Sequence, residues 1–164
     1  MRKPISLLLL IFALCGCSTA IVTPAANLDW QVQAISHEVK ATLKTVEVVT
    51  EYNGTESSVT HEQSPSQGNV YLIINLSVNK LGSQATTFTW QDLTVQDASG
   101  NAYHRVSNDT FLEQQNYKPR LTGLDIRLGE NQGWVCFEIP ASATGGKLNL
   151  VYSGEGSQQQ ISLQ

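Results

Sequence analysis

Residues 70 to 78 alternate between apolar and other side chains, and this period of two restricts the possible fold more than any other feature. The apolar positions share one parity: Val70, Leu72, Ile74, Leu76 and Val78. The other parity carries Tyr71, Asn75, Ser77 and Asn79. Because successive side chains of a strand point to opposite faces, the pattern predicts a half-buried β-strand.

The first part of the domain shows the same period with one interruption. The apolar residues from Leu28 to Ala34 keep one parity, and those from Ile35 to Leu43 continue on the opposite parity. One extra residue in a strand shifts every later side chain to the other face, so we expect a β-bulge near Ala34 and Ile35. Residues 46–52 predict the next strand.

Further short strands follow, with turn residues between them. They are predicted at residues 86–90, 93–97, 133–140 and 148–152, with an edge strand at 161–163. Residues 98–101 predict a tight turn, and the polar residues 55–69 predict a long exposed loop. Residues 104–124 are expected to be irregular, with one helical turn from Thr110 to Glu113 capped by reciprocal side-chain bonds.

Short strands without a long amphipathic helix predict an all-β fold, an antiparallel β-sandwich over residues 28–164. Its core is predicted to combine the apolar face of residues 70–78 with side chains from two later strands. These are Val135, Phe137, Ile139, Leu148 and Leu150. Cys136 and Trp134 fall on the face opposite Val135 and Phe137, so Cys136 is expected to be a small packed residue.

Several elements occur in the order of a known family. They are Ile74-Asn-Leu-Ser-Val-Asn79, Phe88-x-Trp90, Leu93-x-Val95-x-Asp97-x-x-Gly100-x-x-Tyr103, Leu128-Gly129 and Val135-x-Phe137-Glu138-Ile139-Pro140. Together they resemble a bacterial lipoprotein domain of unknown function, similar in fold to the mycobacterial immunoprotective extracellular proteins. The resemblance covers roughly residues 28–152 and implies an immunoglobulin-like antiparallel β-sandwich. It brings no catalytic residues with it.

The N-terminus predicts export and a lipid anchor. Arg2 and Lys3 precede an apolar run that is too short to cross a bilayer permanently, as is typical of a signal peptide. The run ends in Leu14-Cys15-Gly16-Cys17, which resembles the bacterial lipobox. Residues 1–16 are then the signal peptide, and residues 17–27 are a lipidated N-terminus and flexible tether.

In that arrangement the Cys17 thiol carries a diacylglyceryl group as a thioether, and its freed amine is acylated, for example with palmitate. Two or three acyl chains bind a membrane durably, whereas one chain binds only marginally. The alternative is an ordinary cleaved signal that happens to contain cysteines. Because Ser18 rather than an aspartate follows Cys17, we expect the outer membrane in a host with two membranes, and otherwise the outer face of the cell membrane.

Charge and cysteine content exclude some functions. The formal net charge of −4 becomes −6 when Arg2 and Lys3 leave with the signal peptide, which argues against nucleic acid as a partner. Of the three cysteines, Cys15 leaves with the leader and Cys17 is lipidated, so Cys136 is alone. No intramolecular disulfide is expected.

Residues with metal-binding or catalytic chemistry do not form a recognisable motif. Asp97, Ser99 and Asn101 alternate as calcium ligands do, but the spacing of Gly100 and the next acid favours a hydrogen-bonded turn. The histidines, His37, His61 and His104, are scattered and favour solvated side chains. We therefore expect no enzyme activity, no metal and no cofactor.

The expected function is a non-enzymatic module that binds a protein, peptide or glycan at the cell envelope. Residues 104–124 combine aromatic and cationic side chains, which are typical interface anchors, and Tyr117 and Arg120 are the candidate contacts there. Trp134 is a further candidate, with rim packing as its alternative. The alternative for this segment is a packing role, in which Phe111 and Leu112 close the end of the sandwich; it is as well supported as partner binding.

Two other functions stay open at this point. A metal-binding or chaperone module requires the histidines to converge. A hydrolase requires a nucleophile and a histidine in one pocket.

Substitution of the lipobox cysteine tests the anchor. We expect Cys17→Ser to accumulate as an unlipidated precursor that leaves the detergent phase on phase separation, because the thioether cannot form. Normal processing and membrane retention of this variant contradict the prediction.

Overall fold

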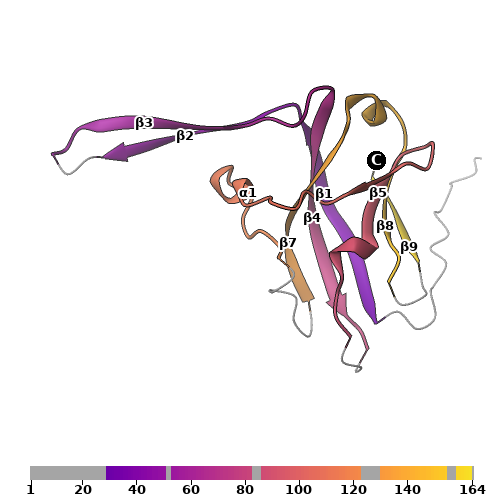
Figure 1. Ribbon diagram of the computed structural model, residues 1–164. Coiled ribbons are helices and arrows are strands. Elements are labelled where there is room, and N and C mark those ends of the chain that lie inside the picture. Colours follow the sequence, from indigo (N-terminus) through magenta and orange to yellow (C-terminus); the bar gives the residue numbers. More distant parts are fainter. Residues whose placement is uncertain (1–28, 51–52, 83–85, 123–129, 155–157, 164) are drawn as a thin grey trace, which may run out of the picture.

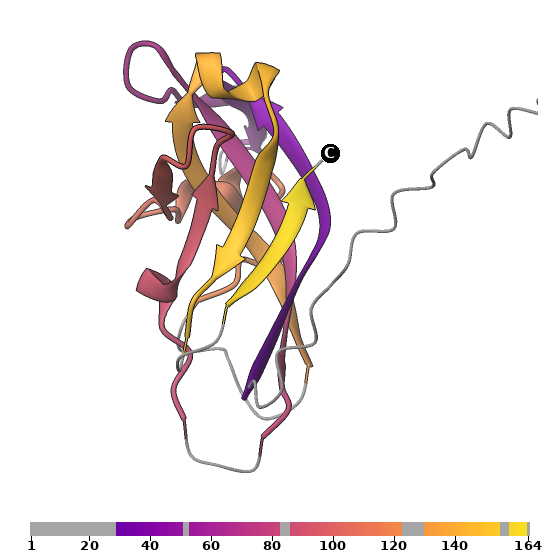
Figure 2. The same ribbon diagram turned by 90° about the vertical axis from the view of Figure 1, so that its right-hand side faces the viewer.

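Two antiparallel sheets face each other in the computed structural model (Figures 1 and 2). The structure describes residues 29–50, 53–82, 86–122, 130–154 and 158–163. The signal peptide, Cys17, Leu28 and the Leu128-Gly129 element lie outside the described residues. The predicted antiparallel β-sandwich is confirmed at this level.

The first sheet has the strand order β1-β4-β7, so β4 lies in the middle. Its strands are β1 (Trp30–Lys40), β4 (Asn69–Lys80) and β7 (Glu130–Pro140). The predicted bulge is confirmed: Ala34 pairs with Leu76, Ser36 pairs with Asn75, and Ile35 between them is exposed. The extra residue changes the parity along β1 while the pairing with β4 continues.

The second sheet has the order β6-β5-β8-β9. Its strands are β5 (Leu93–Gln96), β6 (Ala102–His104), β8 (Leu148–Tyr152) and β9 (Gln159–Leu163). Figure 2 shows β8, drawn in golden orange, and β9, drawn in yellow, side by side in this layer. The predicted edge position of residues 161–163 is confirmed, because β9 is the last strand of the sheet.

The side chain of Gln159 joins the two sheets at one side. Its Nε2 donates to the carbonyl of Trp30 at 2.7 Å, and its Oε1 accepts from the backbone N–H of Val32 at 3.1 Å. One amide therefore satisfies a donor and an acceptor on the outer edge of β1, where a strand neighbour is missing.

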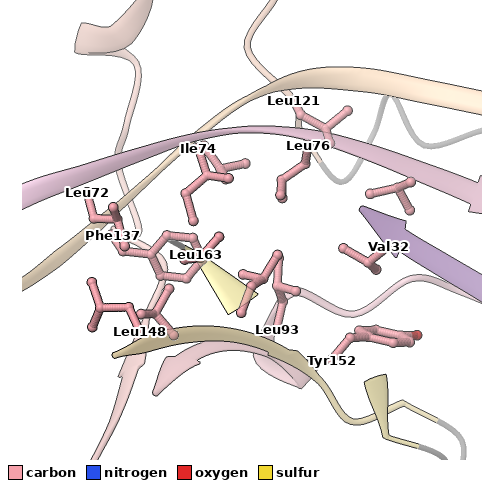
Figure 3. Packing of buried hydrophobic residues seen from close by; sticks show 14 of the residues in the cluster. Val32, Leu72, Ile74, Leu76, Leu93, Leu121, Phe137, Leu148, Tyr152 and Leu163 are labelled. Atoms are coloured by element: carbon pink, nitrogen blue, oxygen red, sulfur yellow. The ribbon is translucent and has the colours of Figure 1, made fainter. Parts of the chain in front are cut away.

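The core lies between the sheets and contains every residue predicted for it, with Val70 at its margin. In Figure 3, Leu72, Ile74 and Leu76 of β4 point toward Leu148 and Tyr152 of β8, with Phe137 between them. Apolar burial of this kind contributes roughly 25 cal/mol per Å² removed from water, so this layer dominates the stability.

The prediction of a long loop at residues 55–69 is wrong. Strands β2 (Leu43–Thr50) and β3 (Glu56–Gln63) form a hairpin and pair from Leu43 opposite Gln63 to Thr50 opposite Glu56. Figure 1 shows this hairpin projecting from the sandwich. Its strands pair through the backbone while most side chains stay in water, so β3 carries no apolar period.

Two smaller expectations are also corrected. Residues 86–89 are not a strand: they lead into the short helix η1 (Trp90–Asp92). Phe88, which precedes this helix, stacks on Tyr152. The helical turn is present as α1 (Phe111–Gln114), but Thr110 makes no capping bond through its side chain. The Thr110 hydroxyl donates to Asn108 instead, and Glu113 pairs with Arg120.

The remaining helical element is η2 (Ala141–Gly145), which follows β7. Within the described part of the chain, every helix is too short to cross a membrane.

Truncation of a central ring tests the core. We expect Phe137→Ala to lower the free energy of unfolding by about 3–5 kcal/mol, because the side chain is fully buried and leaves a cavity. Val48→Ala, at an exposed position of the hairpin, is the control and should change it by less than about 0.5 kcal/mol. Urea denaturation measures both, and coincident curves for Phe137→Ala and the unsubstituted protein contradict the assigned strand phase.

Candidate binding site

The outer face of the first sheet is covered by the irregular segment that follows β6. Tyr71, Ile73 and Cys136 point away from the core and form a second buried cluster with Leu43 and Leu112. Leu112 comes from α1, and Phe111 packs its ring 5.3 Å from that of Tyr71. Phe111 and Leu112 thus cover a sheet face rather than plug the end of the sandwich.

Backbone pairing with β7 fixes both ends of this segment. The N–H of Val106 donates to the carbonyl of Cys136 at 2.9 Å. Farther along, Leu121 donates to the carbonyl of Trp134 at 3.0 Å, and Trp134 donates to that of Pro119 at 2.9 Å. A Cβ at Gly133 would lie 2.8 Å from the Leu121 nitrogen, so the approach requires glycine.

Arg105 and Arg120 are brought together by these two attachments, and Asp109 lies between them. The Asp109 carboxylate accepts from Arg105 Nε at 2.9 Å and Nη2 at 3.1 Å, and from Arg120 Nη1 at 3.0 Å. Arg120 Nε also donates to Glu113 at 3.2 Å. Burial alone would lower the pKa of Arg120, but its hydrogen bonds with Asp109 and Glu113 raise it.

The charges in this cluster differ in their access to water. Asp109 is 1% exposed, and the side chains of Arg105 and Arg120 are 11% and 18% exposed. The Glu113 side chain is 54% exposed, so solvent screens its pairing with Arg120. Asp109 is therefore the carboxylate on which the buried parts of both arginines depend.

Arg105, Asp109 and Arg120 border an open cleft of about 480 Å³. Its lining comprises Trp90, Gln91, His104, Arg105, Val106, Ser107, Asp109, Arg120 and Thr122. The Arg105 guanidinium lies over the Trp90 ring, 4.1 Å from its centroid. This contact and the two bonds to Asp109 hold Arg105 in one orientation.

The candidate contacts predicted from sequence fall in two places. Arg120 lines the cleft, whereas Tyr117 and Trp134 lie outside it, with their rings 5.0 Å apart against the outer-face cluster. Burial and a hydrogen bond to Glu38 raise the pKa of the Tyr117 hydroxyl. Both aromatic rings are half-buried, so packing accounts for much of their surface.

Sequence reasoning missed Trp90, Arg105 and Asp109 as site residues. The available signal was the spacing of Arg105 and Asp109, four residues apart, with Arg120 farther along the same segment. Such a pair is usually a solvated surface contact, and only the pairing with β7 buries it.

The predicted turn at Asp97 is confirmed. Its carboxylate accepts from the backbone N–H groups of Ser99 and Asn101, from the Asn101 side chain, and from the Tyr103 hydroxyl. The hydrogen bonds from the side chains of Asn101 and Tyr103 contribute most to a pKa of about 2 for Asp97. This carboxylate is engaged in holding the turn between β5 and β6.

The other chemically active residues stay apart. His37, His61 and His104 lie on β1, β3 and β6, and His61 contacts Glu47 at 3.2 Å. Among the described residues, no group of three His, Cys, Asp or Glu side chains is arranged to hold a metal ion. Cys136 is fully buried, and burial raises the pKa of its thiol, as expected for a packed residue.

Comparisons with known proteins give one family match. The family described as "Domain of unknown function (DUF4352)" matches residues 36–161. No curated protein matches the chain.

Two solved structures are similar at low identity. An uncharacterized β-sandwich protein from Clostridium difficile 630 is 12% identical, with a TM-score of 0.44 over 85% of this chain and 88% of that one. A conserved hypothetical protein from Bacillus anthracis is 15% identical, with a TM-score of 0.42 over 83% and 99%.

Neutralising each carboxylate bound to Arg120 tests which of them fixes the cluster. We expect Asp109→Asn to lower the free energy of unfolding by about 3–5 kcal/mol, because it leaves two largely buried arginines without their shared anion. Glu113→Gln is the matched control and should cost no more than about 1 kcal/mol. Urea denaturation measures both variants. An equally small decrease in the free energy of unfolding for the two would show that Asp109 does not anchor the segment.

Proposed function

Because the chain belongs to the DUF4352 family, whose description assigns no activity, we propose a function from its own residues: a non-enzymatic binding module of the cell envelope. In this proposal the protein is a lipoprotein whose β-sandwich is immunoglobulin-like. The lipid on Cys17 holds it to the membrane, at the outer membrane if the host has two.

The cleft beside Arg105 and Arg120 is the observation that carries the proposal. Both guanidiniums are largely withdrawn from water yet border an open cavity, and Trp90 fixes one of them. Positioned arginine and aromatic groups are typical of binding hot spots. The partner is a protein, peptide or glycan of the envelope.

Tyr117, Arg120 and Trp134 remain the proposed partner contacts, with Arg105 added. Arg120 acts inside the cleft, while Tyr117 and Trp134 act from outside it, where both are half-buried.

A hydrolase is the second candidate, since His104 and Ser107 line the same cleft. No hydrogen bond joins these two side chains within the described residues, and the nearby Asp109 carboxylate is engaged by the arginines. Orientation of a catalytic histidine usually needs such a carboxylate, so binding is favoured. Covalent labelling of Ser107 by a fluorophosphonate probe would support the hydrolase instead. A metal-binding or chaperone module is less favoured, as the histidines lie on separate strands.

Crosslinking and pull-down of the intact lipoprotein from its own membranes tests the binding function. We expect Arg120→Gln to reduce partner recovery about tenfold, equivalent to roughly 1.4 kcal/mol of binding free energy. Lys44→Gln removes an exposed cation from the hairpin and is the charge-matched control, with recovery unchanged.

Tyr117→Phe keeps the ring and removes the hydroxyl bonded to Glu38. Partner recovery with this variant therefore shows how much that hydrogen bond contributes to binding. A folded Arg120→Gln protein with undiminished recovery of the partner contradicts the proposal that the cleft binds it.

A further inference from the structure

We propose that the cleft binds the carboxylate of an acidic peptide segment, between the free amino groups of Arg105 and Arg120. This inference rests on the proposed binding function and names its ligand chemistry.

The cleft has an excess of positive charge. Among its lining residues, Arg105 and Arg120 are the fixed cations and Asp109 is the acidic residue. Counting only the arginines and the aspartate, the lining carries one formal positive charge in excess, and Glu113, outside the lining, is screened by water. Asp109 balances one of the two guanidinium charges, so an added anion can balance the other.

Each arginine keeps a hydrogen-bond donor group that the described residues do not use. Arg105 uses Nε and Nη2 for Asp109, so its Nη1 group has no partner among the described residues. Arg120 uses Nη1 for Asp109 and Nε for Glu113, so its Nη2 group is likewise without one in the described part of the chain.

Both arginines bond to the same atom, Asp109 Oδ1, at 3.1 and 3.0 Å, which places the two guanidiniums side by side. Charge-assisted bonds from such paired donors to an anion are strong and directional.

Neighbouring groups hold both guanidiniums in place. Arg105 is confined between the Trp90 ring and Asp109, and Arg120 between Asp109 and Glu113. Groups that are already ordered lose little conformational entropy when a ligand binds. The donors are therefore positioned before the ligand arrives.

The charge of the cleft favours a carboxylate over a phosphate group. A single excess positive charge matches a carboxylate, which carries one negative charge. A dianionic phosphate would place its second charge close to the buried Asp109, and like charges at short range repel.

The aromatic group favours a peptide over a glycan. The guanidinium of Arg105 covers one face of Trp90, 4.1 Å from the ring centroid, and Phe88 packs edge-on at 4.9 Å. A sugar could stack on the face that Arg105 covers only after displacing the guanidinium from it. An aspartate or glutamate side chain, or a chain end, needs only the arginine donors and the cavity beside them.

Calorimetric titration of the purified full-length protein tests the inference with defined probes. A capped pentaglutamate peptide should bind the unsubstituted protein and Lys44→Gln equally. Its affinity should fall at least about tenfold for Arg120→Gln and for Arg105→Gln, as expected for loss of a charged donor. Capped pentaglutamine, inorganic phosphate and pentagalacturonate are the comparison probes, and none should bind as well.

Each other outcome overturns part or all of the inference. If pentagalacturonate binds more tightly than pentaglutamate, the ligand is a glycan and not a peptide. If phosphate binds more tightly, the site does not prefer a carboxylate. Equal affinity in the arginine variants, or no binding of any probe, rejects the site for this ligand.

If Arg120→Gln does not fold, Arg120→Lys keeps the charge with a single donor nitrogen. It should still weaken pentaglutamate binding, and unchanged affinity would overturn the inference. The membrane pull-down decides the proposed function separately, because it depends on a native partner rather than on these probes.

Discussion

Burial of β4 on both faces is the constraint on which the rest of the structure depends. The inward face, from Leu72 to Val78, forms the core against the second sheet. The outward face contains Tyr71 and Ile73, which are also buried, so the chain must cover that side with other elements. Residues 105–122 and the base of the hairpin provide this cover, and Thr45 at that base bonds to Gln115 at 2.6 Å.

An irregular cover cannot rely on regular backbone pairing, and a buried ionic cluster helps to fix it here. Asp109 binds Arg105 near one end of the segment and Arg120 near the other. Such a cluster contributes little net stability compared with apolar packing, but it penalises arrangements in which the charges are separated. The same requirement leaves two ordered guanidiniums beside an open cleft, which links the packing of the fold to the proposed binding site.

The sequence predicted those features that leave a periodic trace. The alternation at residues 70–78 identified the core, and the change of parity near Ala34, within the separate alternation of residues 28–43, identified the bulge. The hairpin left no such trace, because Glu56–Gln63 pairs through its backbone and keeps most side chains in water. Arg105 and Asp109 resembled a surface pair for a similar reason: the pairing that buries them involves β7, far along the chain. Arg120 was selected by residue type, but its engagement by Asp109 required the tertiary structure.

The central claim is that Asp109 holds both guanidiniums in place at the cleft. Nitrogen-15 NMR of the arginine side chains tests it directly in the native protein at neutral pH. The account predicts slowly exchanging signals for Arg105 Nε–H and Arg120 Nη1–H, because these two groups donate to Asp109, together with magnetisation transfer from Arg105 to the Trp90 ring. Rapidly exchanging signals at the position of free arginine, without transfer to Trp90, would contradict it.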